Sequence, residues 1–158
     1  DGWFGNVVYA YNDARIDDND GFGDYDADFN REHFFSIGGS WEISERWKFG
    51  ARWKWATGRP TDDFIINSDV LGAGQPLRYS KELTQQNALR LDDSHSLNIR
   101  VDYRRTLGPV DLVAFLDVIN VYGGPGGGSQ EFDPRRGVNV ADEGEAFPII
   151  GLIFERSW

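Results

Sequence analysis

The sequence predicts an all-β fold in which about six antiparallel, up-and-down transmembrane strands form part of a larger β-barrel. Three observations lead to this fold class. Apolar and polar residues alternate along much of the 158-residue chain, as in strands with one apolar and one polar face. The alternating stretches are longer than the strands of ordinary globular proteins. Short and long connections also alternate between them, as in outer-membrane barrels.

Six strands are expected in order along the chain. The clearest is 47–58, where aromatic and small residues on one face alternate with basic residues on the other. Most of the expected strands are 9–13 residues long, and a tilted strand needs about 9–11 residues to cross a membrane. Their predicted ranges are 3–15, 33–43, 47–58, 95–105, 110–122 and 147–158.

The connections predict an orientation. Short turns at 44–46 and 106–109 alternate with three long connections that are rich in Asp, Gly, Pro and Asn, namely 16–32, 59–94 and 123–146. Outer-membrane barrels have short periplasmic turns and long external loops. We therefore expect the outer membrane of a Gram-negative bacterium, with periplasmic chain ends and extracellular long loops. Residues 63–70 resemble a strand, but the 59–94 connection as a whole is interpreted as a loop.

Tryptophan placement supports a membrane environment independently. If successive strands alternate in direction, Trp3, Trp41, Trp47 and Trp158 lie at the short-turn end and Trp55 lies at the other end. Tryptophan concentrates at membrane interfaces because its ring is apolar and its N–H requires a polar partner. These five residues are therefore the predicted interface aromatics. The alternative is that they form the core of a soluble sandwich.

The polar faces of the strands carry charge of both signs. The residues expected to face the barrel lumen are Lys48, Arg52, Lys54, Arg100, Asp102, Arg104, Asp111 and Asp117. The solvated face of a soluble antiparallel sheet would have the same composition. Because known single-chain bacterial barrels start at about eight strands, we expect both edges of this sheet to pair with strands outside the chain.

Four segments carry motifs that occur together in one family. They are KFGARWKWATGRPT (48–61), NALRLDDSHSLNIRVDYRR (87–105), LVAFLDVINVYGG (112–124) and FPIIGLIFERSW (147–158). In this order and spacing they resemble the C-terminal barrel region of TonB-dependent outer-membrane receptors. The chain departs from the family pattern at Ser96 and Asn98, where Arg and Asp are frequent, and at Trp158, where Phe is usual.

The resemblance implies a wall segment of a receptor that takes up a scarce nutrient, such as a ferric chelate, a vitamin or an oligosaccharide. The expected partners are the lipid bilayer, the remaining strands and the plug, in the same protein or in a partner chain. Contact with TonB would occur only through the plug, which we expect to lie outside this chain. Two other hypotheses stay open: a subunit of a multi-chain outer-membrane pore or structural barrel, and a soluble β-sandwich or lipocalin-like binding module.

Other chemistry receives little support from the sequence. Asp24, Asp26 and Asp28 alternate in an acidic stretch and are weak candidates for calcium ligands, but the EF-hand pattern is not met. His33 and His95 occur in no triad or zinc spacing. The net charge of −10 argues against nucleic acid, and the lack of cysteine excludes thiolate chemistry. We therefore expect no enzyme and no cofactor beyond weakly bound external calcium.

Overall fold

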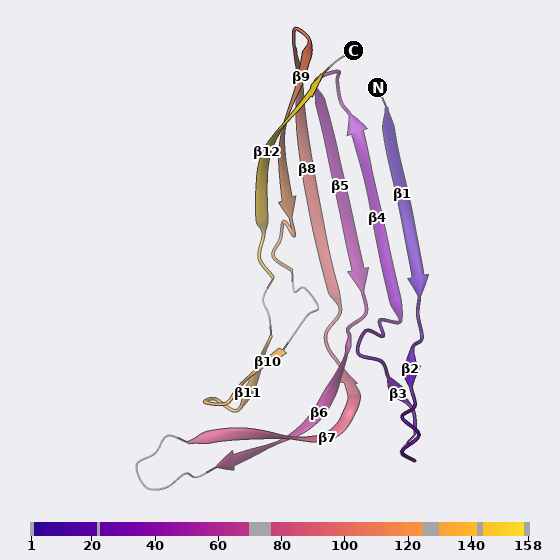
Figure 1. Ribbon diagram of the computed structural model, residues 1–158, viewed down its shortest axis with the longest axis vertical. Helices are drawn as coiled ribbons and strands as arrows, with labels where there is room; N and C mark the ends of the chain where they lie inside the picture. The colour runs from indigo at the N-terminus through magenta and orange to yellow at the C-terminus, as the bar shows by residue number, and fades with distance from the viewer. Residues whose placement is uncertain (1, 22, 70–76, 125–129, 142–143, 157–158) are drawn as a thin grey trace.

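A computed structural model describes residues 2–21, 23–69, 77–124, 130–141 and 144–156. Its main feature is a six-stranded antiparallel sheet in which each long strand pairs with the next long strand along the chain (Figure 1). The strands are β1 (Trp3–Tyr11), β4 (His33–Glu42), β5 (Trp47–Ala56), β8 (Ser94–Leu107), β9 (Val110–Ile119) and β12 (Phe147–Arg156). The predicted all-β, antiparallel architecture is confirmed.

Two short turns close hairpins at one end of this sheet. The hydroxyl of Ser44 accepts hydrogen bonds from the backbone N–H groups of Arg46 and Trp47, at 3.3 Å and 3.2 Å, and this contact tightens the turn between β4 and β5. Gly108, with φ of 63°, opens the two-residue turn between β8 and β9. A positive φ at the first turn position is the type II′ pattern, which matches the twist of the flanking strands.

The long connections contain strands, which corrects the prediction that they are loops. They hold β2 (Arg15–Ile16) with β3 (Tyr25–Asp26), β6 (Pro60–Asp69) with β7 (Arg78–Arg90), and β10 (Gln130–Asp133) with β11 (Val138–Ala141). A hairpin that included 63–70 was considered from the sequence and set aside for lack of clean alternation, and register shifts between Thr61 and Phe64 account for that irregularity. All three small sheets lie beyond the same end of the main sheet, opposite the short turns (Figure 1).

Two of the predicted strands end three or four residues earlier than expected. The first strand ends at Tyr11, and Arg15 belongs to the separate strand β2. The strand predicted to reach residue 122 ends at Ile119, because Asn120 adopts a left-handed backbone conformation with φ of 54°. That conformation interrupts the extended backbone, and here the strand ends at it.

The register separates the two faces of the main sheet across all six strands. Residues directly opposite each other in an antiparallel pair project on the same face. One row across the sheet is entirely apolar: Trp3, Trp41, Phe49, Val101, Leu116 and Ile150. The next row projects on the other face: Phe4, Ser40, Gly50, Arg100, Asp117 and Ile149. Polar residues on this second face are therefore concentrated on the inner strands, whereas the edge strands β1 and β12 place Phe4 and Ile149 there.

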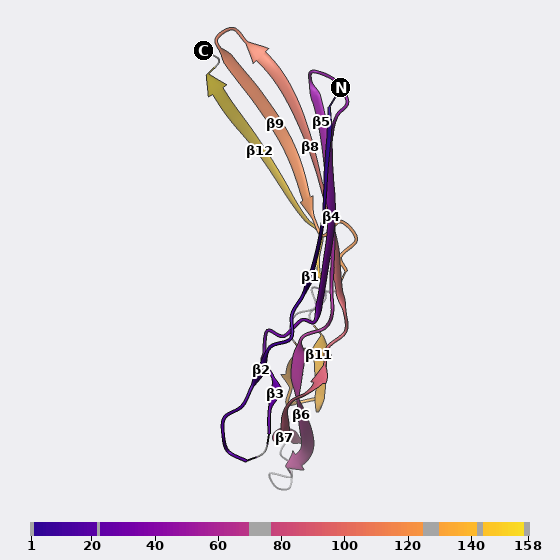
Figure 2. The same ribbon diagram turned by 90° about the vertical axis from the view of Figure 1, so that its right-hand side faces the viewer.

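The main sheet is a single layer. It curves, so that β8, β9 and β12 are inclined to the plane of β1, β4 and β5 (Figure 2). Among the described residues, only Ala27, Ala56 and Val113 are buried apolar residues, whereas Trp3 and Ile150 are each 82% exposed. In that part of the chain, β1 and β12 each pair with one neighbour, so the sheet is open at both edges. The described residues include no helix that is long and apolar enough to span a membrane.

Candidate functional site

The polar face of the main sheet is the first candidate site. The register places all eight charged residues predicted for the lumen on this one face. They are Lys48, Arg52, Lys54, Arg100, Asp102, Arg104, Asp111 and Asp117. A hollow of about 390 Å³ opens on the same side, and Arg52, Arg100 and Asp117 are among the residues that line it. Whether this face borders a lumen stays a prediction.

Charges on the half of the polar face near the short turns are paired. The guanidinium of Arg100 lies 2.8 Å from Asp102 and 4.0 Å from Asp117, and it stacks 4.2 Å from the centre of the Phe115 ring. Lys48 lies 3.9 Å from Glu42, and Arg104 lies at the same distance from Glu155. The side chains of these last two pairs are about half exposed. Such pairs orient charge while contributing little to stability.

Charges on the other half of the polar face are less balanced. In the register, Lys54 lies between Ser36 of β4 and Ser96 of β8. Arg31, which precedes β4, donates a 2.8 Å hydrogen bond from Nη1 to the hydroxyl of Ser94. Partial burial, and secondly the nearby charge of Arg59, lower the pKa of Arg31. This half of the face therefore gathers positive charge close to hydroxyl groups.

The predicted interface aromatics lie on the apolar face. Trp3 is directly opposite Trp41 near the short turns, and the ring of Trp47 lies 4.8 Å from the ring of Tyr103. Trp55 lies at the other end of the sheet, opposite Phe35. Their positions agree with two aromatic bands, while their contact with lipid stays a prediction. Trp158 lies outside the described residues.

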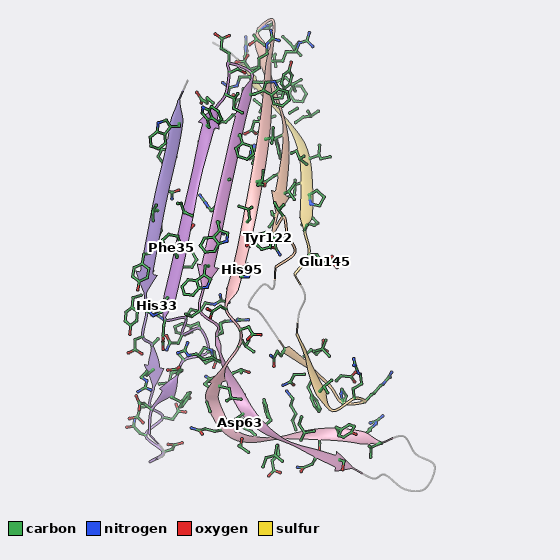
Figure 3. The ribbon with its side chains drawn as sticks, turned by 180° about the vertical axis from the view of Figure 1, so that it is seen from behind. His33, Phe35, Asp63, His95, Tyr122 and Glu145 are labelled. Carbon is green, nitrogen blue, oxygen red and sulfur yellow. The ribbon has the colours of Figure 1, made fainter. Side chains whose placement is uncertain are left out.

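Two tyrosine–histidine pairs extend the band at the long-loop end. Tyr9 Oη lies 2.9 Å from His33 Nδ1, and Tyr122 Oη lies 3.0 Å from His95 Nδ1. His33, His95 and Tyr122 lie at the same end of the sheet as Phe35 (Figure 3). The spacing of the two histidines in the sequence indicated neither a catalytic triad nor a zinc site. Their positions in the alternation already place them on the aromatic face.

The three aspartates proposed as calcium ligands are engaged by arginine and asparagine side chains, and Arg15 reaches both Asp24 and Asp26. Asp24 pairs with Arg15 at 2.8 Å, Asp26 pairs with Arg90 at 2.6 Å, and the carboxylate of Asp28 accepts a 2.7 Å hydrogen bond from the amide of Asn87. Within the described ranges, no three acidic or histidine side chains are grouped as a metal site. Calcium binding therefore stays a prediction without a convergent ligand set.

The same acidic stretch contains one perturbed phenol. Tyr25 Oη donates a 2.8 Å hydrogen bond to the carboxylate of Asp18, and this bond raises the pKa of Tyr25. Desolvation and the charges of Asp18 and Asp28 act in the same direction. This hydrogen bond links two parts of the same acidic stretch. It makes Asp18 less available as a ligand.

Polar contacts link the ends of the long strands to the external hairpins. The Gly58 N–H donates to Asp93 Oδ1 at 3.1 Å, and a Cβ at Gly58 would overlap the carbonyl group of Leu91. The Asn120 N–H donates to Asn98 Oδ1 at 3.0 Å. Asn98 is a position at which the chain departs from the family pattern, yet its side chain fixes the end of β9. These roles were not predicted from the sequence.

The external hairpins also contact one another. Lys81 Nζ lies 4.3 Å from the centre of the Phe64 ring and 4.8 Å from that of Phe132. The Tyr79 N–H donates a 2.9 Å hydrogen bond to the carbonyl of Pro134. The β6–β7 and β10–β11 hairpins therefore form one joined surface beyond the long-loop end. Comparison with family models, with curated proteins and with solved structures gave no match.

Proposed function

We propose that the chain is a wall segment of a TonB-dependent type of receptor in a Gram-negative outer membrane, engaged in uptake of a scarce nutrient. One observation carries this proposal: the register places an unbroken apolar row across six consecutive long strands on one face and gathers the charges of the inner strands β5, β8 and β9 on the other. A barrel wall needs this separation, because one face meets lipid and the other meets the lumen.

Exposure of the apolar face favours a membrane over a soluble sandwich. A sandwich covers the apolar face of each sheet with a second layer. Here large apolar side chains on that face are open, including Trp3 at 82%, Phe154 at 67% and Val7 at 63% exposure. Strands of 9 to 14 residues in the main sheet match the length required for a tilted membrane crossing.

Asymmetry between the two ends supports a receptor rather than a plain scaffold. The short-turn end has two tight hairpins, whereas the other end carries three small sheets connected by side-chain contacts. A structured external surface above a charged lumen suits the capture of a solute from outside. The resemblance of the four motifs supports the TonB-dependent type, and under this proposal the plug and the remaining strands lie outside this chain.

Fractionation of the native protein tests the membrane proposal. We expect it to sediment with outer membranes, to require detergent for extraction and to migrate differently on gels before and after boiling. The protein staying monodisperse in buffer without detergent would contradict the proposal and favour the sandwich. Intact mass then tests the receptor: a polypeptide or complex well above 17.9 kDa that includes a plug is expected.

The open edges also suit a second arrangement, a barrel assembled from several chains. β1 and β12 run in opposite directions, so β12 of one chain and β1 of another would pair antiparallel, as the other long strands do. A native complex made only of chains of 17.9 kDa would favour this arrangement over the receptor. A single longer polypeptide would exclude it.

A further inference from the structure

Two basic side chains follow each other on the polar face of β5. Arg52 and Lys54 are two residues apart, which separates their Cα atoms by about 7 Å and directs both side chains to the same side. Gly38 and Ser36 lie opposite them on β4, and Asn98 and Ser96 lie opposite them on β8. These small neighbours leave space around the two charges and provide hydroxyl and amide groups beside them.

A third cation, Arg31, reaches the same part of the face. It donates to Ser94, and it lines a hollow of about 140 Å³ together with Lys54 and Ser96. The hollow is small, and Arg52, two residues from Lys54 on the same strand and face, lines the neighbouring hollow of about 390 Å³. Burial and the charge of Arg59 lower the pKa of Arg31, because both disfavour its charged form. An anion placed in this hollow would offset both effects.

Among the residues whose positions are described, Arg52 and Lys54 lack the carboxylate partner that Lys48 has on the same strand. In the part of the chain that the structure describes, no carboxylate oxygen lies within 4.0 Å of the charged nitrogens of Arg52 or Lys54. Glu32 binds Arg90 at 2.9 Å, and Asp93 accepts the N–H of Gly58. Lys48, on the same face of β5, does have a carboxylate partner in Glu42. The unbalanced charge is thus confined to one half of the face.

We propose that Arg31, Arg52 and Lys54 form a binding site for a small solute that carries two or more anionic oxygen groups. The arginines suit paired oxygens of a carboxylate or phosphate, the lysine acts as a point charge, and the serines donate hydroxyl hydrogen bonds. This inference deepens the proposed function and rests on it for the location of the site in a barrel lumen. It adds the chemical class of the solute.

Calorimetric titration of the intact, detergent-extracted protein that contains this chain tests the site. Citrate serves as the carboxylate probe, pyrophosphate as the phosphate probe and maltose as the uncharged control. We expect at least one anion to bind and maltose not to bind, and the preferred anion identifies the oxygen chemistry. Lys54→Gln and Arg52→Gln should each weaken binding at least tenfold. Lys48→Gln, the matched control on the same strand and face, should change it less than twofold.

Other outcomes of the titration would overturn the site. The site is refuted if neither citrate nor pyrophosphate binds at millimolar concentration. This holds whether the face is open in the intact protein or is covered by another of its segments. The site is also refuted if Lys48→Gln weakens anion binding as much as Lys54→Gln does, because binding would then reflect general charge attraction. Lys54→Arg keeps the charge and should retain binding, which separates loss of the site from loss of folding. A detergent-free, soluble protein would refute the proposed function, whereas the titration judges the site by itself.

Discussion

Arg90 on β7 donates a 2.6 Å hydrogen bond from Nη2 to Oδ2 of Asp26 on β3, which joins segments 64 residues apart in the chain. The same guanidinium reaches Glu32 at 2.9 Å and the backbone carbonyls of Asn30 and Gly58 at 3.2 Å and 3.3 Å. Asn30 is fully buried beneath this contact. One side chain therefore holds the acidic stretch, the end of β5 and the β6–β7 hairpin together.

Replacing Arg90 should loosen the external surface and leave the main sheet intact. Arg90→Gln removes a charged hydrogen-bond donor from two carboxylates, for which we expect a local loss of about 1–3 kcal/mol. Hydrogen exchange should accelerate in 25–32 and 78–90 and stay unchanged in β5 and β8. Arg104→Gln is the control, since the Arg104–Glu155 pair is more than half exposed, lies on the main sheet and should contribute little. Unchanged exchange in 25–32 would contradict this role.

A charge at the middle of the apolar face tests the face assignment. Ile99 lies in the row that contains Gly5, Gly39, Ala51 and Val118, between the two aromatic bands. Ile99→Arg should lower the free energy of unfolding by about 2–4 kcal/mol if that row faces the bilayer midplane. Urea unfolding of the native protein in lipid vesicles measures this change.

Asn6→Arg is the matched control for the face assignment. Asn6 is exposed, lies one row from Ile99 and projects on the polar face. The same charge there should change stability by less than about 0.5 kcal/mol. If Ile99→Arg and Asn6→Arg change the free energy of unfolding equally, the two faces of the sheet do not border lipid on one side and water on the other.

The main sheet could be predicted from the sequence because its signal is local. Alternation along β5 and β8 alone sets which residues share a face, so the charged set from Lys48 to Asp117 was assigned to one side correctly. The contact between Arg90 and Asp26 could not be predicted in this way. It depends on how two external segments meet in space, and neither segment contains a pattern that specifies the other.

Strand ends illustrate the same limit. The alternation through 110–122 continues past the true end of β9, because a left-handed residue such as Asn120 leaves no mark in the apolar pattern. In β7, Asn87 has φ of 49° beside the register shifts. This irregularity interrupts the alternation from which the hairpin could have been predicted. Asparagine tolerates this conformation better than most residues. Asparagines inside alternating stretches are therefore the positions to inspect for strand ends.

Asn120 should be sensitive to substitution for two separable reasons. Its side chain donates to the Gly124 carbonyl at 2.9 Å and accepts from the Gly124 N–H at 3.2 Å. Asn120→Ala loses both bonds and strains the positive φ, for an expected cost of about 1–3 kcal/mol in unfolding free energy. Asn120→Gly loses the bonds but relieves the strain, so it should cost less. The hypothesis fails if glycine is as damaging as alanine in the same denaturation assay.

Gly58 is expected to tolerate no side chain, because the backbone at Leu91 passes directly beside it. A Cβ there would overlap the Leu91 carbonyl, so Gly58→Ala must displace the start of the β6–β7 hairpin. Gly50 is the matched control on β5, since its nearest neighbour to an added Cβ is 3.8 Å away, an ordinary contact. We expect Gly58→Ala to destabilise the protein by more than about 1 kcal/mol and to increase proteolysis within 59–94, whereas Gly50→Ala should do neither. Equal protease resistance of the two variants would show that the hairpin is not held at Gly58.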